Sequence, residues 1–301
     1  MLEPAAAATP TDFRAVARLA LSQAAKVRGL NARDARLMRL FATAVYHLPE
    51  ADAVARIAPV TSIDTAERLD TSVRVTRWLH DIGFTTVEPL PVDQPVASHG
   101  CAVTFWRYLP QRGPVPKPAD LGRLLCQLHE LSPPPVQLPD HQPLRSVRQA
   151  IQSSQAISED ERTWLSDHCL QLQNAYRSLE FALPAGMIHG DAYRGNLLRD
   201  RHGVVLADWD AVSNGPREVD LIPTFQATRF GLQEGERDAF IAAYGPDIRT
   251  WAGYQVLHEI RELSTTSALL RDAHLDATRH RELKTRLRSL RVGDDRPWTA
   301  F

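Results

Sequence analysis

Asp191, Asn196 and Asp208 are polar residues whose types and order suit chemistry on a phosphate group. Transfer of a phosphoryl group needs a carboxylate beside the acceptor hydroxyl, an amide oxygen for a divalent cation, and a second carboxylate that holds the cation against the phosphates. The three residues supply these groups, and Asn196 follows Asp191 by five residues, as Asn follows Asp in the catalytic loop of protein kinases. This stretch therefore predicts phosphoryl transfer.

Short apolar runs must position these three side chains. Met187-Ile188 precedes Asp191, and residues 204–206 precede Asp208, so the pattern predicts a pair of strands that brings the polar residues together. One alternative is a polar hairpin with capping aspartates. Another is a metal-dependent phosphohydrolase, although the stretch lacks the additional His and Asp ligands of a two-metal site.

The composition excludes several other classes of protein. The chain has 301 residues, of which 44% are hydrophobic, and its formal net charge of -1 gives no reason to expect a nucleic-acid partner. Its 3 cysteines have no paired spacing, which argues against a zinc site or a disulfide framework. We find no secretion signal and no apolar run of about 18 residues, so we expect a cytoplasmic protein without a membrane partner.

The first third of the chain alternates between helix and strand patterns. Apolar residues at helical spacing predict two helices, and short runs rich in Val, Ile and Tyr predict strands of a small antiparallel sheet. The helices are expected at residues 11–30 and 64–81, and the strands at 40–48, 53–60, 87–90 and 102–109.

Prolines at 110, 114, 116 and 118 form a stiff connector, and the sequence beyond them is mostly helical in pattern. Helices are expected at residues 121–131 and 158–181, with a proline-rich loop at 132–143 between them. We therefore predict two domains, residues 1–110 with the sheet and 111–301 with most of the helices.

At this point the sequence resembles the aminoglycoside phosphotransferase family, which also includes choline kinase-like small-molecule kinases. The resemblance depends on three motifs, namely His189-Gly190-Asp191 with Asn196, Asp208-Trp209-Asp210, and Glu218-Val219-Asp220-Leu221 after Gly215-Pro216. It implies an α+β, bilobal, protein-kinase-like fold with a small antiparallel sheet in the N-lobe and a larger, mostly helical C-lobe.

The resemblance also implies roles for the residues of these motifs. Asp191 would be the catalytic base, and Asn196 and Asp208 would hold Mg²⁺ for a nucleotide, ATP or GTP. Asp220 would be a buried carboxylate that braces the backbone of the catalytic loop, and His189 would support that loop.

For Asp210 and for the residue that anchors the nucleotide, the sequence leaves two alternatives each. Asp210 is either a second metal contact or a carboxylate of the turn. The family places a basic residue for the nucleotide phosphates on a strand that corresponds to residues 54–57, where this chain carries Arg56. No lysine lies between Lys26 and Lys117, so Arg56 is the residue available for this role; the alternative is an arginine on the solvent face of the strand.

The helix that follows departs from the family pattern. The family offers a Glu about six residues before the pair Trp78-Leu79, and this chain has Ser72 there. Glu67 or Asp70 could substitute from a neighbouring turn, or the nucleotide alone could orient the arginine.

Three further nucleotide contacts follow from position in the chain. Residues 41–46 occupy the phosphate-covering loop without a glycine, so contacts would come from backbone amides and the Thr43 hydroxyl. The strand at 104–110 leads into the hinge, where adenine would bond to main-chain groups near Arg107 and Leu109.

The helical half offers fewer signals for the acceptor. His129 at the end of a leucine-rich helix is interpreted as a structural cap. Glu259 and Glu262 lie one helical turn apart and could bind a cationic substrate; the equal alternative, given Arg261 and Arg271, is a self-paired, solvated face. Residues 251–301 contain 9 Arg plus Lys and 7 Asp plus Glu, a net charge of +2, which disfavours a polycationic aminoglycoside.

The sequence thus predicts an ATP- or GTP-dependent O-phosphotransferase that acts on a small molecule, either an antibiotic, as in resistance, or a metabolite. We expect a monomer or homodimer. The alternative is a degenerate kinase-like protein that binds a nucleotide without turnover, which Ser72 and Arg56 favour and the intact set of Asp191, Asn196 and Asp208 opposes.

Overall fold

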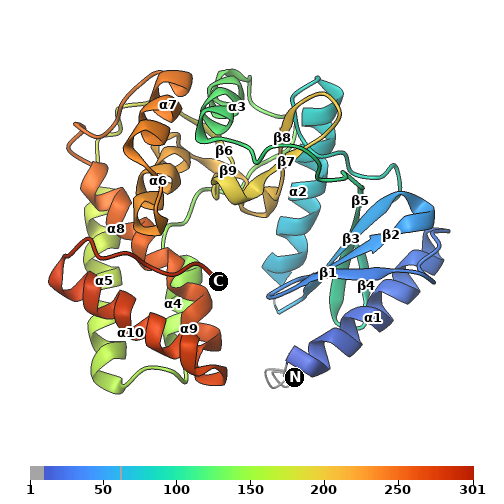
Figure 1. Ribbon diagram of the computed structural model, residues 1–301, viewed down its shortest axis with the longest axis horizontal. Coiled ribbons are helices and arrows are strands. Elements are labelled where there is room, and N and C mark those ends of the chain that lie inside the picture. The colour runs from blue at the N-terminus through green and yellow to red at the C-terminus, as the bar shows by residue number, and fades with distance from the viewer. Residues whose placement is uncertain (1–9, 62) are drawn as a thin grey trace. The chain divides into compact units, whose positions relative to one another are not determined.

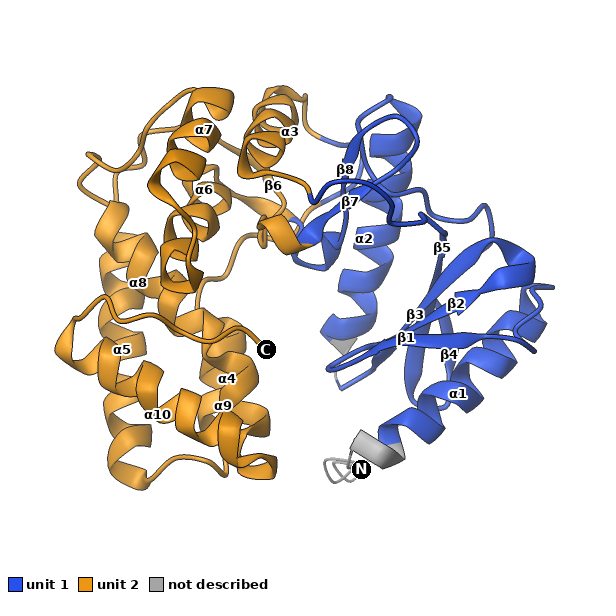
Figure 2. Cartoon of the chain, in the orientation of Figure 1, with its two compact units in different colours: residues 1–115, 134–137, 196–212 blue, residues 116–133, 138–195, 213–301 orange. Residues whose placement is uncertain are grey.

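The computed structural model describes residues 10–61 and 63–301, which form two compact units (Figures 1 and 2). Unit 1 contains the described residues up to 115 together with residues 134–137 and 196–212. Unit 2 contains residues 116–133, 138–195 and 213–301. Each unit is described separately below, and the predicted domain boundary at residue 110 stays a prediction.

Unit 1 is built on a five-stranded antiparallel sheet in the order β1-β2-β3-β5-β4 (Figure 1). Helices α1 (Pro10–Val27) and α2 (Ile63–Asp81) belong to the same unit. The strands are β1 (Arg36–Leu40), β2 (Ala44–Leu48), β3 (Ala53–Pro59), β4 (Val96–Ser98) and β5 (Cys101–Arg107).

The two faces of the sheet are covered by different helices. Ala55 and Ile57 of β3 belong to the buried cluster that includes residues of α1. On the other face, Ala58 of β3 packs against Leu69 of α2. Because side chains alternate along a strand, Arg56 lies on the same face as Ala58, which is the face covered by α2.

The strand predicted over residues 40–48 is present as β2, which pairs with β3 as expected, but its predicted start is wrong, because β1 and a turn occupy residues 36–43. The backbone N–H of Phe41 donates to the carbonyl of Thr43 at 3.0 Å, which closes the turn. β1 was missed because Arg36 and Arg39 leave it with no clear alternation of apolar residues. The predicted strand 87–90 is also wrong: Pro89 makes only an isolated bridge to Trp106, since proline has no N–H for a ladder.

A small hairpin from later in the chain completes unit 1. Strands β7 (Leu197–Arg199) and β8 (Val204–Leu206) pair with each other. The backbone N–H of Leu206 donates to the carbonyl of Thr85, and its carbonyl accepts from the N–H of Val87. These bonds attach the hairpin to the segment that follows α2.

Unit 2 is mainly helical around one pair of antiparallel strands, β6 (Ala185–Ile188) and β9 (Ser213–Pro216). The leucines of α3 at residues 121, 124, 125 and 128 are buried, and α3 packs against α7. The helices are α3 (Pro118–Glu130), α4 (Arg145–Ser153), α5 (Glu159–Arg177), α6 (Glu218–Gln226), α7 (Glu234–Tyr244), α8 (Tyr254–Thr265), α9 (Ser267–Asp272) and α10 (Ala277–Val292). None of the helices in the described residues is both long and apolar enough to cross a lipid bilayer.

Candidate functional site

Arg56 and two aspartates form an ion-pair cluster in unit 1. The Nη1 and Nη2 atoms of Arg56 lie 3.1 and 2.8 Å from the two carboxylate oxygens of Asp210. Nη2 also lies 2.9 Å from Oδ1 of Asp208. One guanidinium between two carboxylates leaves one net negative charge, so the cluster is suited to an additional cation.

The turn that carries these aspartates is anchored by Trp209, which is completely buried between them. The Trp209 indole N–H donates to the hydroxyl of Thr86 at 2.8 Å, and its ring packs edge-on against Phe84. Asp208 has a φ of 67°, in the left-handed region that residues other than glycine rarely adopt. Strained backbone of this kind concentrates at functional sites.

Ser72 lies at the place where the family pattern has an acidic residue, and its hydroxyl donates to Oδ1 of Asp210 at 3.2 Å. The expectation that Glu67 or Asp70 substitutes for that residue is wrong. Asp70 pairs with Arg74 on the exposed side of α2, and Glu67 is exposed. Within the described residues, the carboxylates paired with Arg56 are those of Asp208 and Asp210.

The environment of Arg56 keeps it charged. Burial alone would lower the pKa of the guanidinium, but the charges of Asp210 and Asp208 and their hydrogen bonds outweigh burial and raise the pKa above its ordinary value. Arg56 is therefore a fixed cation on the covered face of the sheet.

Asn196 and Asp208 lie at the same end of the β7–β8 hairpin. Asn196 is buried directly before β7, and its backbone carbonyl accepts a hydrogen bond from the N–H of Ala207 at 2.9 Å. The described residues hold no group of three or more His, Cys, Asp or Glu side chains arranged for a metal ion. An amide oxygen with one carboxylate fits Mg²⁺, which takes few protein ligands and completes its shell with water and phosphate oxygens.

The other predicted nucleotide contacts lie at the end of β5, just after it, and in the turn between β1 and β2. Thr43 is the last residue of the turn before β2, and it is partly buried. The backbone N–H of Arg107 already donates to the carbonyl of Glu88, and the guanidinium of Arg107 pairs with the Glu88 carboxylate. The carbonyl of Leu109 accepts from the side chain of Gln111 at 2.8 Å.

In unit 2, Asp191 follows β6 in a loop whose backbone is held by Asp220. Asp220 is completely buried, and its Oδ2 and Oδ1 accept from the backbone N–H groups of His189 and Gly190 at 2.7 and 2.8 Å. Gly190 has a φ of 81°, which a residue with a side chain adopts only at a cost. His189 is also completely buried.

His129 provides a third donor to Asp220. The sequence did not predict this contact. Its Nε2 lies 3.1 Å from Oδ2 of Asp220 and its Nδ1 lies 3.0 Å from the Tyr244 hydroxyl, so it is not the helix cap that was predicted. Burial alone would raise the pKa of Asp220, but the hydrogen bond and charge of His129 and the charge and backbone N–H of His189 outweigh it and lower the pKa. Asp220 is thus an ionised acceptor for three donors.

Arg261 is a second residue whose place was not predicted. Its Nη1 lies 2.7 Å from Oδ1 of Asp191, and the two side chains are 21% and 42% exposed. The sequence left this face of α8 open between a contact for a cationic substrate and a self-paired, solvated surface. The structure instead places a positive charge beside the candidate catalytic carboxylate.

The interpretation of Glu262 as a contact for a cationic substrate is wrong. Its carboxylate is buried and accepts from Nε of Arg229 at 2.5 Å, so its charge is already neutralised. Glu259 accepts from the side chain of Gln255 at 3.0 Å. Both glutamates line a cavity of about 650 Å³, whose walls also carry Arg237.

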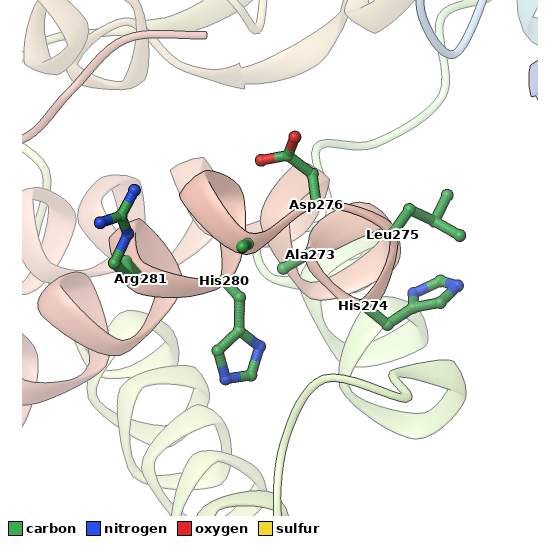
Figure 3. Close-up of a pocket in the computed structure, with 7 residues that line it drawn as sticks. Ala273, His274, Leu275, Asp276, His280 and Arg281 are labelled. Atoms are coloured by element: carbon green, nitrogen blue, oxygen red, sulfur yellow. The ribbon is translucent and has the colours of Figure 1, made fainter.

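A second hollow of about 670 Å³ lies at the turn between α9 and α10 (Figure 3). Its lining residues include none of the predicted site residues. Figure 3 shows the carboxylate of Asp276 on one side of the helices and the rings of His274 and His280 on the other. These polar groups do not converge on one point.

Comparison with known proteins identifies the family of the chain. Residues 11–257 match the model of the Phosphotransferase enzyme family. No protein of curated function matches the sequence.

Several solved structures share the fold at low sequence identity. Amicoumacin kinase in complex with AMP-PNP, Ca²⁺ and Ami is 14% identical with a TM-score of 0.73, covering 95% of this chain and 98% of that chain. The microcompartment-associated aminopropanol kinase is 14% identical with a TM-score of 0.65, covering 90% and 94% of the two chains. A choline/ethanolamine kinase family protein from Mesorhizobium loti is 15% identical with a TM-score of 0.60, covering 94% and 95%. These similarities establish the bilobal α+β, kinase-like fold.

Proposed function

The chain belongs to the phosphotransferase enzyme family, and we propose that it transfers the γ-phosphoryl group of ATP or GTP to a hydroxyl of a small molecule. The observation that carries this proposal is the cluster in unit 1, where Arg56 lies against Asp208 and Asp210 with Asn196 at the same end of the hairpin as Asp208. A nucleoside triphosphate requires this arrangement, in which a phosphate-binding cation lies beside oxygen ligands for a metal ion.

Unit 1 would bind the nucleotide. Arg56 would contact the phosphates, Thr43 would lie near them, and main-chain groups near Arg107 and Leu109 would meet the base. Asn196 and Asp208 would hold Mg²⁺, which, when bound, neutralises charge on the phosphates. The solved relatives support nucleotide binding, because amicoumacin kinase carries AMP-PNP and a spectinomycin phosphotransferase carries ADP.

Unit 2 would supply the base. The carboxylate of Asp191 accepts the proton of the acceptor hydroxyl while the hydroxyl oxygen bonds to the γ-phosphorus. The bond from that phosphorus to the β,γ-bridging oxygen breaks, and the nucleoside diphosphate leaves with the electron pair. Asp220 fixes the backbone on which Asp191 is presented. The joint action of the two units on one nucleotide is part of the proposal.

The ion pair between Arg261 and Asp191 favours the second candidate, a protein that binds a nucleotide without turnover. An arginine bonded to the base competes with the acceptor hydroxyl for the same oxygen. The two candidates differ in one measurable property, which is acceptor-dependent release of ADP or GDP.

The test is a screen of hydroxylated metabolites and antibiotics for acceptor-dependent release of ADP or GDP, with product identified by mass. We expect at least one acceptor to be phosphorylated, and Asp191→Asn to lower the rate by about 100- to 10,000-fold while nucleotide affinity stays near that of the wild type. Asp167→Asn, an exposed carboxylate of unit 2, is the matched control. Two results would contradict the proposal: a protein that binds the nucleotide but phosphorylates none of the screened acceptors, and an Asp191→Asn variant that keeps most of the wild-type phosphorylation rate.

A further inference from the structure

The two aspartates of the unit 1 cluster do not share Arg56 equally. Asp210 meets the guanidinium with both oxygens, at 3.1 and 2.8 Å, which is the two-pronged geometry that fixes the plane of an arginine. Asp208 meets it with one oxygen at 2.9 Å. Asp210 therefore determines the orientation of Arg56 more strongly than Asp208 does.

Asp210 is itself held from a second side. The hydroxyl of Ser72, a residue that is 1% exposed, donates to Oδ1 of Asp210 at 3.2 Å. The carboxylate thus connects β3, through Arg56, with α2, through Ser72. A carboxylate at position 72 would lie next to Asp210, so the two positions can carry only one negative charge without repulsion.

We propose that Asp210 is the positioning residue for Arg56, and that it replaces an acidic residue of α2 where this chain has Ser72. The inference depends on the proposed nucleotide site, because Arg56 matters there as the phosphate contact. It assigns the two aspartates different tasks: Asp210 orients the arginine, and Asp208 with Asn196 remains for the divalent cation.

Both aspartates lie on one anchored turn. Trp209, which lies between them in the sequence, is completely buried, and its indole N–H donates to the hydroxyl of Thr86.

The first experiment measures thermal unfolding of the whole chain without any ligand. In an Asp210→Asn background, Ser72→Glu is compared with Ser72→Gln, which has nearly the same size and no charge. We expect the glutamate to raise the unfolding midpoint by about 2–5 °C relative to the glutamine, because it offers Arg56 a new partner. With Asp210 present, we expect the glutamate variant to unfold at a lower temperature than the glutamine variant, because the carboxylate at position 72 then lies beside that of Asp210.

The comparison of Glu with Gln cancels the effect of inserting a long side chain at a buried position. Asp70→Asn, on α2 but paired with Arg74, is the matched control and should leave the midpoint unchanged. A glutamate that behaves like glutamine in both backgrounds would overturn the proposal. So would a glutamate that stabilises the protein equally with and without Asp210.

The second experiment separates a positioning residue from a metal ligand. The rate of ATP hydrolysis and the Mg²⁺ concentration for half-maximal rate are measured for Asp210→Asn and Asp208→Asn. We expect Asp210→Asn to lower the rate about 10- to 100-fold, to change the half-maximal Mg²⁺ concentration less than about twofold, and to recover with Ser72→Glu but not with Ser72→Gln.

The half-maximal Mg²⁺ concentration should rise about tenfold or more in Asp208→Asn. A similar rise in Asp210→Asn would make that residue a metal ligand and overturn the proposal. If the wild-type chain binds neither ADP nor ATP in equilibrium titration, the proposed function fails. The ligand-free comparison still decides whether Asp210 holds Arg56, so the two failures are distinguishable.

Discussion

Asp220→Asn should destabilise unit 2 strongly although it changes only one atom. The carboxylate accepts from the backbone N–H groups of His189 and Gly190 and from the ring of His129. An asparagine in its place has one acceptor oxygen and an NH₂ group, so at least one buried N–H faces another donor. The remaining bonds also lose the assistance of the negative charge.

The expected cost follows from these contacts. Losing a charge-assisted bond and leaving a buried donor without a partner should lower the free energy of unfolding by about 3–5 kcal/mol. Urea unfolding measures this change. Hydrogen exchange of the peptide that contains Gly190 measures its local part, and it should accelerate about 100-fold or more.

The pH dependence has a definite sign. Because the pKa of Asp220 is lowered in the folded protein, its stabilising contribution is present above the unfolded pKa of about 3.9 and is lost as the pH falls through the lower folded value. The difference between wild type and Asp220→Asn should therefore stay constant from about pH 5 to 8 and narrow below about pH 4.

A surface ion pair provides the control for this prediction. Asp247 also has a lowered pKa, caused first by its hydrogen bond from Arg249, but its side chain is 36% exposed. Asp247→Asn should cost less than about 1 kcal/mol. An Asp220→Asn protein as stable as Asp247→Asn, with unchanged exchange at Gly190, would refute the reasoning about the buried carboxylate.

The remaining predictions concern the proposed activity. Arg56→Ala should weaken nucleotide affinity or rate about 10- to 150-fold in titration and steady-state assays, and Arg56→Lys should recover part of it. Asp208→Asn should lose the Mg²⁺-dependent part of ADP affinity, while affinity in excess chelator stays unchanged. Arg261→Gln should improve kcat/KM for cationic acceptors about 3- to 10-fold relative to anionic ones, whereas Arg288→Gln, an exposed arginine of α10, should not. If the ratio of kcat/KM for cationic and anionic acceptors is the same in the two glutamine variants, Arg261 does not contribute to the choice of acceptor.

Local patterns were sufficient for much of the fold. Helices α1 and α2 were predicted at 11–30 and 64–81 and lie at Pro10–Val27 and Ile63–Asp81, because apolar residues recur at helical spacing with a glycine after each helix. β3 was predicted within one residue for the corresponding reason. α4 was missed, since its nine residues have only three buried side chains and follow a proline-rich loop. Short elements give too few repeats of a pattern to be recognised.

The candidate site shows the same limit at the level of side chains. Asp191, Asn196 and Asp208 could be selected as candidates because their spacing is local. Their partners could not, because Arg261 is 70 residues from Asp191 in the sequence. Periodicity specifies which face of an element is buried, but it does not specify which distant side chain meets that face.

Arg56 and Asp210 lie between these extremes. The absence of lysine from Lys26 to Lys117 reduced the candidates for a phosphate contact, so Arg56 was selected by elimination. Asp210 is 154 residues away, and the sequence left its role open between a metal contact and a turn. The triplet Asp208-Trp209-Asp210 nevertheless contains a usable signal. A large apolar side chain in a turn favours burial, and the acids on either side of it then favour a cationic partner from another element. In unit 1 that cation is Arg56, and the hydroxyl of Ser72 donates a hydrogen bond to the Asp210 carboxylate that holds it.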